Sequence, residues 1–167
     1  MKAIVYQSNS GHTQRYAELF SAKSGLPVFE LKDASQNIAK GDDIIFFGWI
    51  CAGSMPGFSK AAKKYSVRAF CAVGMGRPDG KQIFDLAKKY NFTSDNAFYL
   101  QGGFDFRKLH GIYKFMMSTL SKFMGPSLEK KEDKTDEEIE ILTMLKDGRD
   151  FVREENLAPV LSWLKAH

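Results

Sequence analysis

The sequence lacks long apolar runs and has few cysteines. None of its hydrophobic runs approaches the roughly 20 residues of a membrane-spanning helix. Its two cysteines, Cys51 and Cys71, lie in apolar or strand-like surroundings and form no metal-type cluster. The first residues pass directly into an apolar strand-like run, without the pattern of a signal peptide. We therefore expect a soluble cytoplasmic protein with reduced thiols and no metal site.

A large excess of charge of one sign is also missing, and the chain is only mildly basic. The 24 Lys and Arg residues against 20 Asp and Glu residues give a net charge of +4, with an isoelectric point near 9.0. This balance is too weak to indicate a nucleic-acid partner. With 44% hydrophobic residues in 167 positions, we expect one globular domain over residues 1–167.

The first candidate site follows a short apolar run, Lys2 to Gln7, which is typical of a strand buried on both faces. The next six residues are mostly small or hydrogen-bonding, and a helical pattern resumes at Tyr16. The first-turn amides of a helix favour an anion, hydroxyl groups add donors, and Gly11 permits a close backbone approach. The loop is thus a candidate phosphate site.

Two common phosphate motifs are absent from this loop. There is no lysine between Lys2 and Lys23, which excludes a nucleoside-triphosphate loop, and Gly11 is the loop's single glycine, which excludes a dinucleotide fingerprint. What remains is a phosphate monoester held by neutral donors. An ordinary helix cap rich in Ser and Thr is the alternative.

Four further strand-like runs alternate with helical segments. Such alternation predicts an α/β fold with a parallel sheet, in which ligands bind beyond the carboxyl ends of the strands. The loops after the first, third and fourth runs should therefore meet at one site. The five runs are Lys2–Gln7, Pro27–Leu31, Ile44–Gly48, Val67–Val73 and Ala97–Gln101.

The spacing Ser-x-Ser-Gly-x-Thr at a strand–helix junction resembles the flavodoxin family. This resemblance implies a three-layer sandwich with a five-stranded parallel sheet in the order 2-1-3-4-5. It also implies FMN as cofactor, with its phosphate in the first loop. His12 is expected to be exposed and to contribute only its backbone amide. The phosphate residues would be Ser8, Asn9, Ser10, Gly11, His12 and Thr13.

The resemblance also assigns the next two loops to the flavin ring. Trp49 is the candidate to pack on the ring, although an aromatic residue at a strand end is often simple core. Arg77 would stabilise charge on reduced flavin, or else is a solvated loop arginine. No catalytic side chain is expected, because the flavin carries the chemistry. The ring residues would be Trp49, Ile50, Cys51, Ala52, Gly53, Gly74, Met75, Gly76 and Arg77.

A competing signal crosses the second of these loops. Cys71 and Arg77 match Cys-x5-Arg, the signature in which a thiolate of low pKa attacks a phosphate. The signature loop of low-molecular-weight phosphatases follows the first strand, whereas Cys71 lies inside the fourth run. A thiol phosphatase is thus a remote alternative.

Residues 101–150 form a segment beyond a short flavodoxin, and we expect it to be largely helical. A basic helix over 107–124, rich in Met and aromatic residues, is a core helix, a partner-binding surface or an interfacial membrane helix. Further predictions are a capping box at Thr135–Glu138, a bend over Asp147–Phe151, and a last helix opened by Pro159.

The start of this segment resembles bacterial flavodoxin-type protoporphyrinogen oxidases through a Gly-aromatic-x-aromatic-Arg turn. This implies an FMN oxidoreductase that passes electrons to a quinone, with membrane association through the 107–124 helix. Gly103, Phe104, Phe106 and Arg107 would then lie near substrate or partner. The alternative is a flavodoxin-type electron carrier. Its redox partner would be a quinone, a reductase or a small-molecule substrate.

Overall fold

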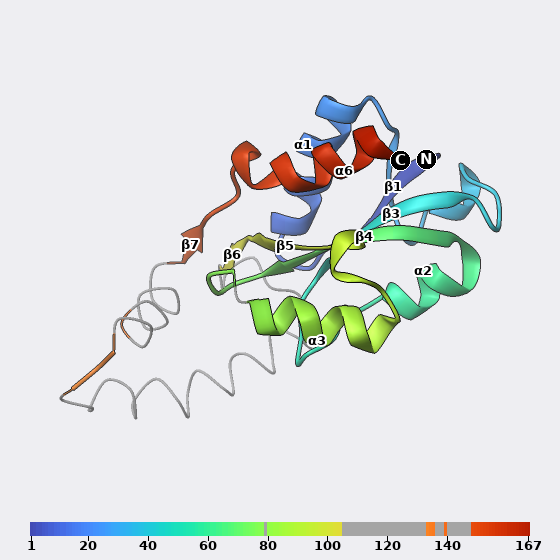
Figure 1. The fold of residues 1–167 in the computed structure, drawn as a ribbon. Coiled ribbons are helices and arrows are strands. Elements are labelled where there is room, and N and C mark those ends of the chain that lie inside the picture. The colour runs from blue at the N-terminus through green and yellow to red at the C-terminus, as the bar shows by residue number, and fades with distance from the viewer. Residues whose placement is uncertain (79, 105–132, 136–138, 140–147) are drawn as a thin grey trace.

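The computed structural model describes residues 1–78, 80–104, 133–135, 139 and 148–167 (Figure 1). Five parallel strands form one sheet in the order β2-β1-β3-β4-β5. This confirms the predicted α/β fold and strand order, and it is consistent with a flavodoxin-like sandwich. The strands are β1 (Ala3–Gln7), β2 (Val28–Glu30), β3 (Asp43–Trp49), β4 (Ser66–Gly74) and β5 (Ala97–Gln101).

Helices cover both faces of the sheet. Figure 1 shows α1 and α6 on one face and α2 and α3 on the other. Short 3₁₀ turns occupy Ala34–Gln36, Ser94–Asn96 and Glu154–Leu157. The α-helices of the described ranges are α1 (His12–Ser24), α2 (Phe58–Lys64), α3 (Gly80–Tyr90) and α6 (Ala158–Ala166).

The central strands bury side chains on both faces. Along β1, Ile4 packs in the core beneath α1 and α6, and the next residue, Val5, packs in the core beneath α2 and α3. Successive strand residues point to opposite faces, so a strand covered on both sides must be apolar throughout. This explains why β1, β3 and β4 are continuous hydrophobic runs rather than alternating ones.

The element bounds differ slightly from the predictions. Pro159 lies in the first turn of α6, one residue after its start, rather than opening it. Proline fits there because first-turn amides have no partner in the helix. Several predictions lie outside the described residues: the 107–124 helix, the two residues Phe106 and Arg107, and most of the helix expected after Thr135. Asp79, of a residue type that often caps helices, also lies outside them.

The sequence did not predict a small ribbon beside the sheet. Strand β6 (Gly103–Phe104) pairs antiparallel with β7 (Arg149–Asp150), where we had expected only a bend. The Phe151 N–H then donates to Gly102 O at 2.7 Å. Tyr16, fully buried on α1, donates from its hydroxyl to Gln101 O at 2.6 Å. Hydrogen bonds therefore hold the chain both where it leaves the sheet after β5 and where it returns at β7.

Candidate functional site

The loop after β1 enters α1 through a glycine. Gly11 is the N-cap with φ 90°, and no side chain of the described residues caps the helix. The first helical hydrogen bond runs from Arg15 N–H to Gly11 O at 3.0 Å, so the amides before Arg15 lie outside the helical ladder. The N-cap residue has no side chain, so the Ser and Thr residues of the loop do not cap the helix from that position.

The polar side chains of the loop have separate environments. Ser8 Oγ accepts a hydrogen bond from Gly11 N–H at 3.1 Å, which tightens the turn. Thr13 is only 2% exposed, inside the first turn of α1. Asn9 Nδ2 is buried and has no hydrogen-bond partner among the described residues. A buried unpaired donor costs free energy unless a ligand or water satisfies it.

His12 differs from its prediction. We expected an exposed loop histidine, but its side chain is only 4% exposed and it is the first residue of α1. Its Nδ1 lies 3.0 Å from Ser10 Oγ. A Cβ added to Gly102 would lie 3.3 Å from His12 Cβ, so the end of β5 packs closely on the histidine. The sequence could not show this contact, because it joins residues far apart in the chain.

The loop after β3 folds into a tight turn. Trp49 ends β3, half-buried, and Ile50 N–H donates to Val73 O at 2.9 Å. Cys51 and Ser54 then exchange two backbone hydrogen bonds of 2.8 and 3.0 Å. The two residues between them have positive φ, 45° at Ala52 and 66° at Gly53, as in a type I′ turn.

Helix α3 holds this turn from one side. Lys89 Nζ donates to Gly53 O at 2.9 Å and also bonds Ser54 Oγ. Tyr90 Oη accepts a hydrogen bond from Met55 N–H at 2.8 Å. The loop predicted to contact the flavin ring is therefore fixed by two residues at the end of α3, which the sequence analysis had not assigned to the site.

The loop after β4 is held by Tyr99 of β5. The Tyr99 hydroxyl donates to Gly76 O at 2.8 Å, and a Cβ at Gly74 would lie 2.2 Å from that hydroxyl. Gly74 must therefore stay a glycine if Tyr99 is to reach the loop. Met75 is 45% exposed, and Arg77 is also exposed. Tyr99 is thus a third residue, after Lys89 and Tyr90, that holds one of these loops and that sequence patterns did not indicate.

Hydrogen bonds and close packing join the three loops. Gly102 N–H donates to Gly74 O at 2.8 Å, and the same glycine packs on His12. Through Val73 and Ile50 the loop after β4 is bonded to the loop after β3. The carboxyl ends of β1, β3, β4 and β5 thus meet, and Gly102, which we had not singled out, joins the loop after β1 to the loop after β4.

The charged residue Asp150 of β7 lies beside the candidate phosphate loop. Its carboxylate pairs with the Arg15 guanidinium of α1 and accepts Val152 N–H at 3.0 Å. Burial opposes ionisation of Asp150, but the Val152 hydrogen bond and the charges of Arg15 and His12 outweigh it and lower its pKa. Asp150 is thus ionised near neutral pH, and it lies close enough to His12 for the charge of that residue to lower its pKa.

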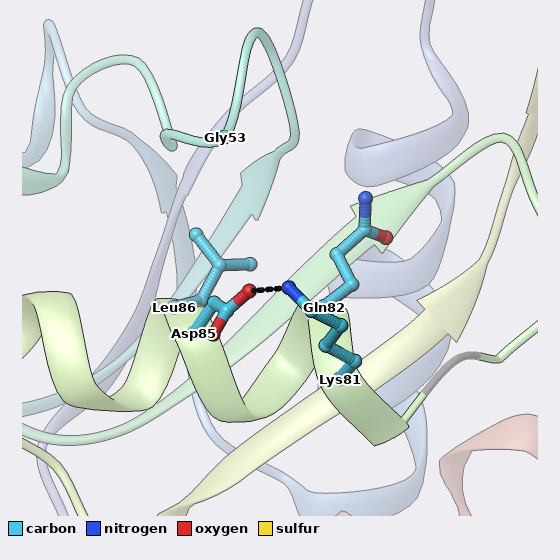
Figure 2. Close-up of a pocket in the computed structure, with 5 residues that line it drawn as sticks. All are labelled: Gly53, Lys81, Gln82, Asp85 and Leu86. Atoms are coloured by element: carbon cyan, nitrogen blue, oxygen red, sulfur yellow. Dashed lines mark hydrogen bonds and ion pairs between the residues drawn. The ribbon is translucent and has the colours of Figure 1, made fainter.

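A cavity lies between the turn after β3 and the first half of α3. It encloses about 280 Å³ and is lined by Gly53, Lys81, Gln82, Asp85 and Leu86. Figure 2 shows the Lys81–Asp85 ion pair, 2.7 Å long, running along the helix at this wall. The cavity borders one of the two predicted ring loops, on the side where α3 holds it.

Cys71 of the Cys-x5-Arg pattern does not have the surroundings that the nucleophile of a thiol phosphatase needs. Cys71 is fully buried within β4, and burial raises the pKa of its thiol well above the usual value. A phosphatase needs an accessible thiolate with a lowered pKa, so the geometry argues against this alternative. Of the predicted substrate residues, Gly103 and Phe104 form β6, and the other two lie outside the described part of the chain.

Comparisons with protein-family models, with curated proteins and with solved structures find no match to this chain. Among the helices of the described ranges, none has the length and hydrophobicity to cross a membrane.

Proposed function

We propose that this chain is a flavodoxin-like redox protein that binds FMN without a covalent bond. The observation that carries the proposal is the meeting of three loops at the carboxyl ends of β1, β3 and β4, which is where open parallel sheets bind ligands. One loop opens a helix at a glycine cap, another is a tight turn, and the third is exposed from Met75 to Arg77. This combination suits a ligand with a phosphate at one end and a flat ring at the other.

The residues present fit the phosphate end of FMN. The first-turn amides of α1 lie outside the helical ladder, and the positive end of the helix dipole favours an anion. Asn9 supplies a buried amide donor without a partner in the described structure. A phosphate oxygen would satisfy that donor. Gly11 reaches its φ of 90° with open space at the position of a Cβ, which leaves room for a close approach.

The remaining residues would hold the ring and exclude water from it. The Trp49 side chain ends β3 beside the Cys51–Ser54 turn, and the Gly74–Arg77 loop offers backbone groups fixed by Tyr99. FMN supplies hydride and single-electron transfer when bound, and the protein supplies orientation and electrostatics. Arg77 would favour negative charge on the ring.

Within this class we propose an oxidoreductase linked to a quinone, of the protoporphyrinogen dehydrogenase type. The pairing of residues 103–104 with residues 149–150 beside the loop after β1 supports it, because the segment between them leaves and rejoins the described chain next to the candidate site. A flavodoxin-type carrier is the alternative. Turnover of a porphyrinogen with a quinone as acceptor would support the enzyme. A protein whose flavin only cycles with a reductase would be a carrier.

The cofactor is tested by titrating the apoprotein with FMN and with riboflavin. We expect tight FMN binding and much weaker riboflavin binding. Asn9→Leu should then weaken FMN binding about tenfold, because a hydrogen bond to a charged group is lost. The same change should not destabilise the apoprotein, because it removes a buried unpaired amide. Absence of binding of either flavin would refute the proposal.

A further inference from the structure

The outer surface formed by α2 and α3 is strongly basic. The two helices cover the same face of the sheet (Figure 1), and the ring centroids of Phe58 and Tyr90 lie 4.0 Å apart between them. Together they carry six lysines, and Asp85 is their one acidic residue. The exposed lysines are Lys60, Lys63, Lys64, Lys81, Lys88 and Lys89. This surface, which we call the α2–α3 face, therefore has a positive potential although the whole chain has a net charge of only +4.

Most of this charge is not compensated by the protein itself. Lys81 pairs with Asp85 at 2.7 Å, and Lys89 donates to the turn after β3. The other four lysines form no ion pair with the residues that the structure describes. On the opposite face of the sheet, by contrast, the arginine and the lysine of α1 are both paired with carboxylates. The α2–α3 face can therefore attract and orient a negatively charged partner.

An exposed aromatic ring and a cavity lie on the two sides of α3. Phe84 is 63% exposed, more than any other large hydrophobic side chain in the described ranges. With 3.6 residues per turn, Phe84 and Gln82 lie on opposite sides of the helix, and Lys81 and Lys88 lie between these sides. Figure 2 shows Gln82 on the side of α3 that faces Gly53, where the cavity of about 280 Å³ lies. An apolar anchor, a recess and a basic rim are together typical of a protein-binding surface.

These features favour a protein partner over a lipid surface. A helix that binds a membrane interface presents a broad apolar face. On α2 and α3, by contrast, Phe84 is the one large hydrophobic side chain that is exposed. A fluid layer of headgroups also gains nothing from a cavity of fixed shape, whereas a protruding side chain of a protein can fill one.

We infer that the α2–α3 face docks an acidic protein. Its carboxylates contact the lysines, its apolar surface covers Phe84, and one of its side chains enters the cavity. A standard interface of about 800 Å² per partner spans α3 from side to side, because a helix with its side chains is about 10 Å across. The docked protein also covers the turn that Lys89 holds. The inference goes beyond the proposed function, and docking needs no FMN.

The test measures binding of an acidic plant-type ferredoxin to the full-length apoprotein by calorimetry. Binding should weaken about tenfold between about 0.05 M and about 0.2 M salt, because the contacts are between surface charges. Lys88→Glu should weaken it about fivefold and Phe84→Ala about threefold. Lys165→Glu is the matched control, because it makes the same change of net charge on α6, on the other face of the sheet, and should leave binding unchanged. These side chains are exposed, so the variants should keep the fold.

Two results would overturn the inference. One is that ferredoxin does not bind, or that Lys88→Glu or Phe84→Ala binds it as the unaltered protein does. The other is that both variants lose binding to vesicles of phosphatidylcholine and phosphatidylserine while ferredoxin binding is unchanged, which would make the α2–α3 face a membrane contact. The proposed cofactor is judged separately by the flavin titration. Ferredoxin that docks on a protein without affinity for FMN would support the docking surface and refute the cofactor.

Discussion

At the scale of single residues, the two cysteines have opposite surroundings. Cys51 lies half-buried in the tight turn after β3, and burial raises the pKa of its thiol moderately. Cys71 is fully buried in β4, and its pKa is raised much further. Thiol reagents attack the thiolate and need access to it. The two side chains therefore report on different parts of the molecule.

We predict that a thiol reagent modifies Cys51 in the native protein and reaches Cys71 only after unfolding. The measurement is a time course with an aromatic disulfide reagent, with and without urea. Cys51→Ser, the control, should abolish the native reaction. Saturating FMN should slow the reaction of Cys51, because the turn that contains it would contact the ring. Rapid modification of Cys71 in the folded protein would contradict the burial and reopen the phosphatase alternative.

At the scale of elements, the β6–β7 ribbon depends on one glycine. Gly103 has φ 139°, and an added Cβ would lie 2.1 Å from Arg149 O on the opposite strand. Backbone cannot move aside as a flexible side chain can. Both the φ and the contact therefore require glycine at this position.

Gly103→Ala should open the ribbon and lower the free energy of unfolding by about 2 kcal/mol. Urea unfolding measures the loss, and faster hydrogen exchange at the Phe151 amide, which bonds Gly102 O, locates it. The matched control is Gly80→Ala at the start of α3, where an added Cβ meets nothing within 4 Å. It should change stability by less than about 1 kcal/mol. Equal effects of the two substitutions would contradict the role of the ribbon.

Elements differ in how far their sequence predicts them. The central strands were predictable because burial on both faces leaves an uninterrupted apolar run, such as Ile44–Gly48 in β3. The ribbon was not, because strands of two residues have no periodicity and their pairing joins distant parts of the chain. The loop after β1 was singled out by residue type, but the packing of His12 against Gly102 could only come from the folded structure.

At the scale of the whole molecule, the described core of the sheet and its helices contains no residue of the inserted segment between β5 and Phe151. The described cores on both faces of the sheet are built from residues before Gln101 and after Phe151. The insertion leaves the sheet after β6 and returns through β7, with Phe104 and Arg149 paired across the ribbon. These two residues are placed as the flanking pair of a hairpin would be.

A shortened chain in which a two-residue Asn-Gly turn replaces residues 105–148 should therefore fold, because such a turn closes an antiparallel pair. Circular dichroism and urea unfolding establish the fold. If the loops after β1, β3 and β4 form the whole cofactor site, the shortened protein should keep its FMN affinity and its preference over riboflavin. It should lose reaction with a porphyrinogen or quinone, since the removed residues include Phe106, Arg107 and the 107–124 helix, to which part of the substrate role and the membrane role were assigned. A folded chain that no longer binds FMN would show instead that residues 105–148 complete the cofactor site.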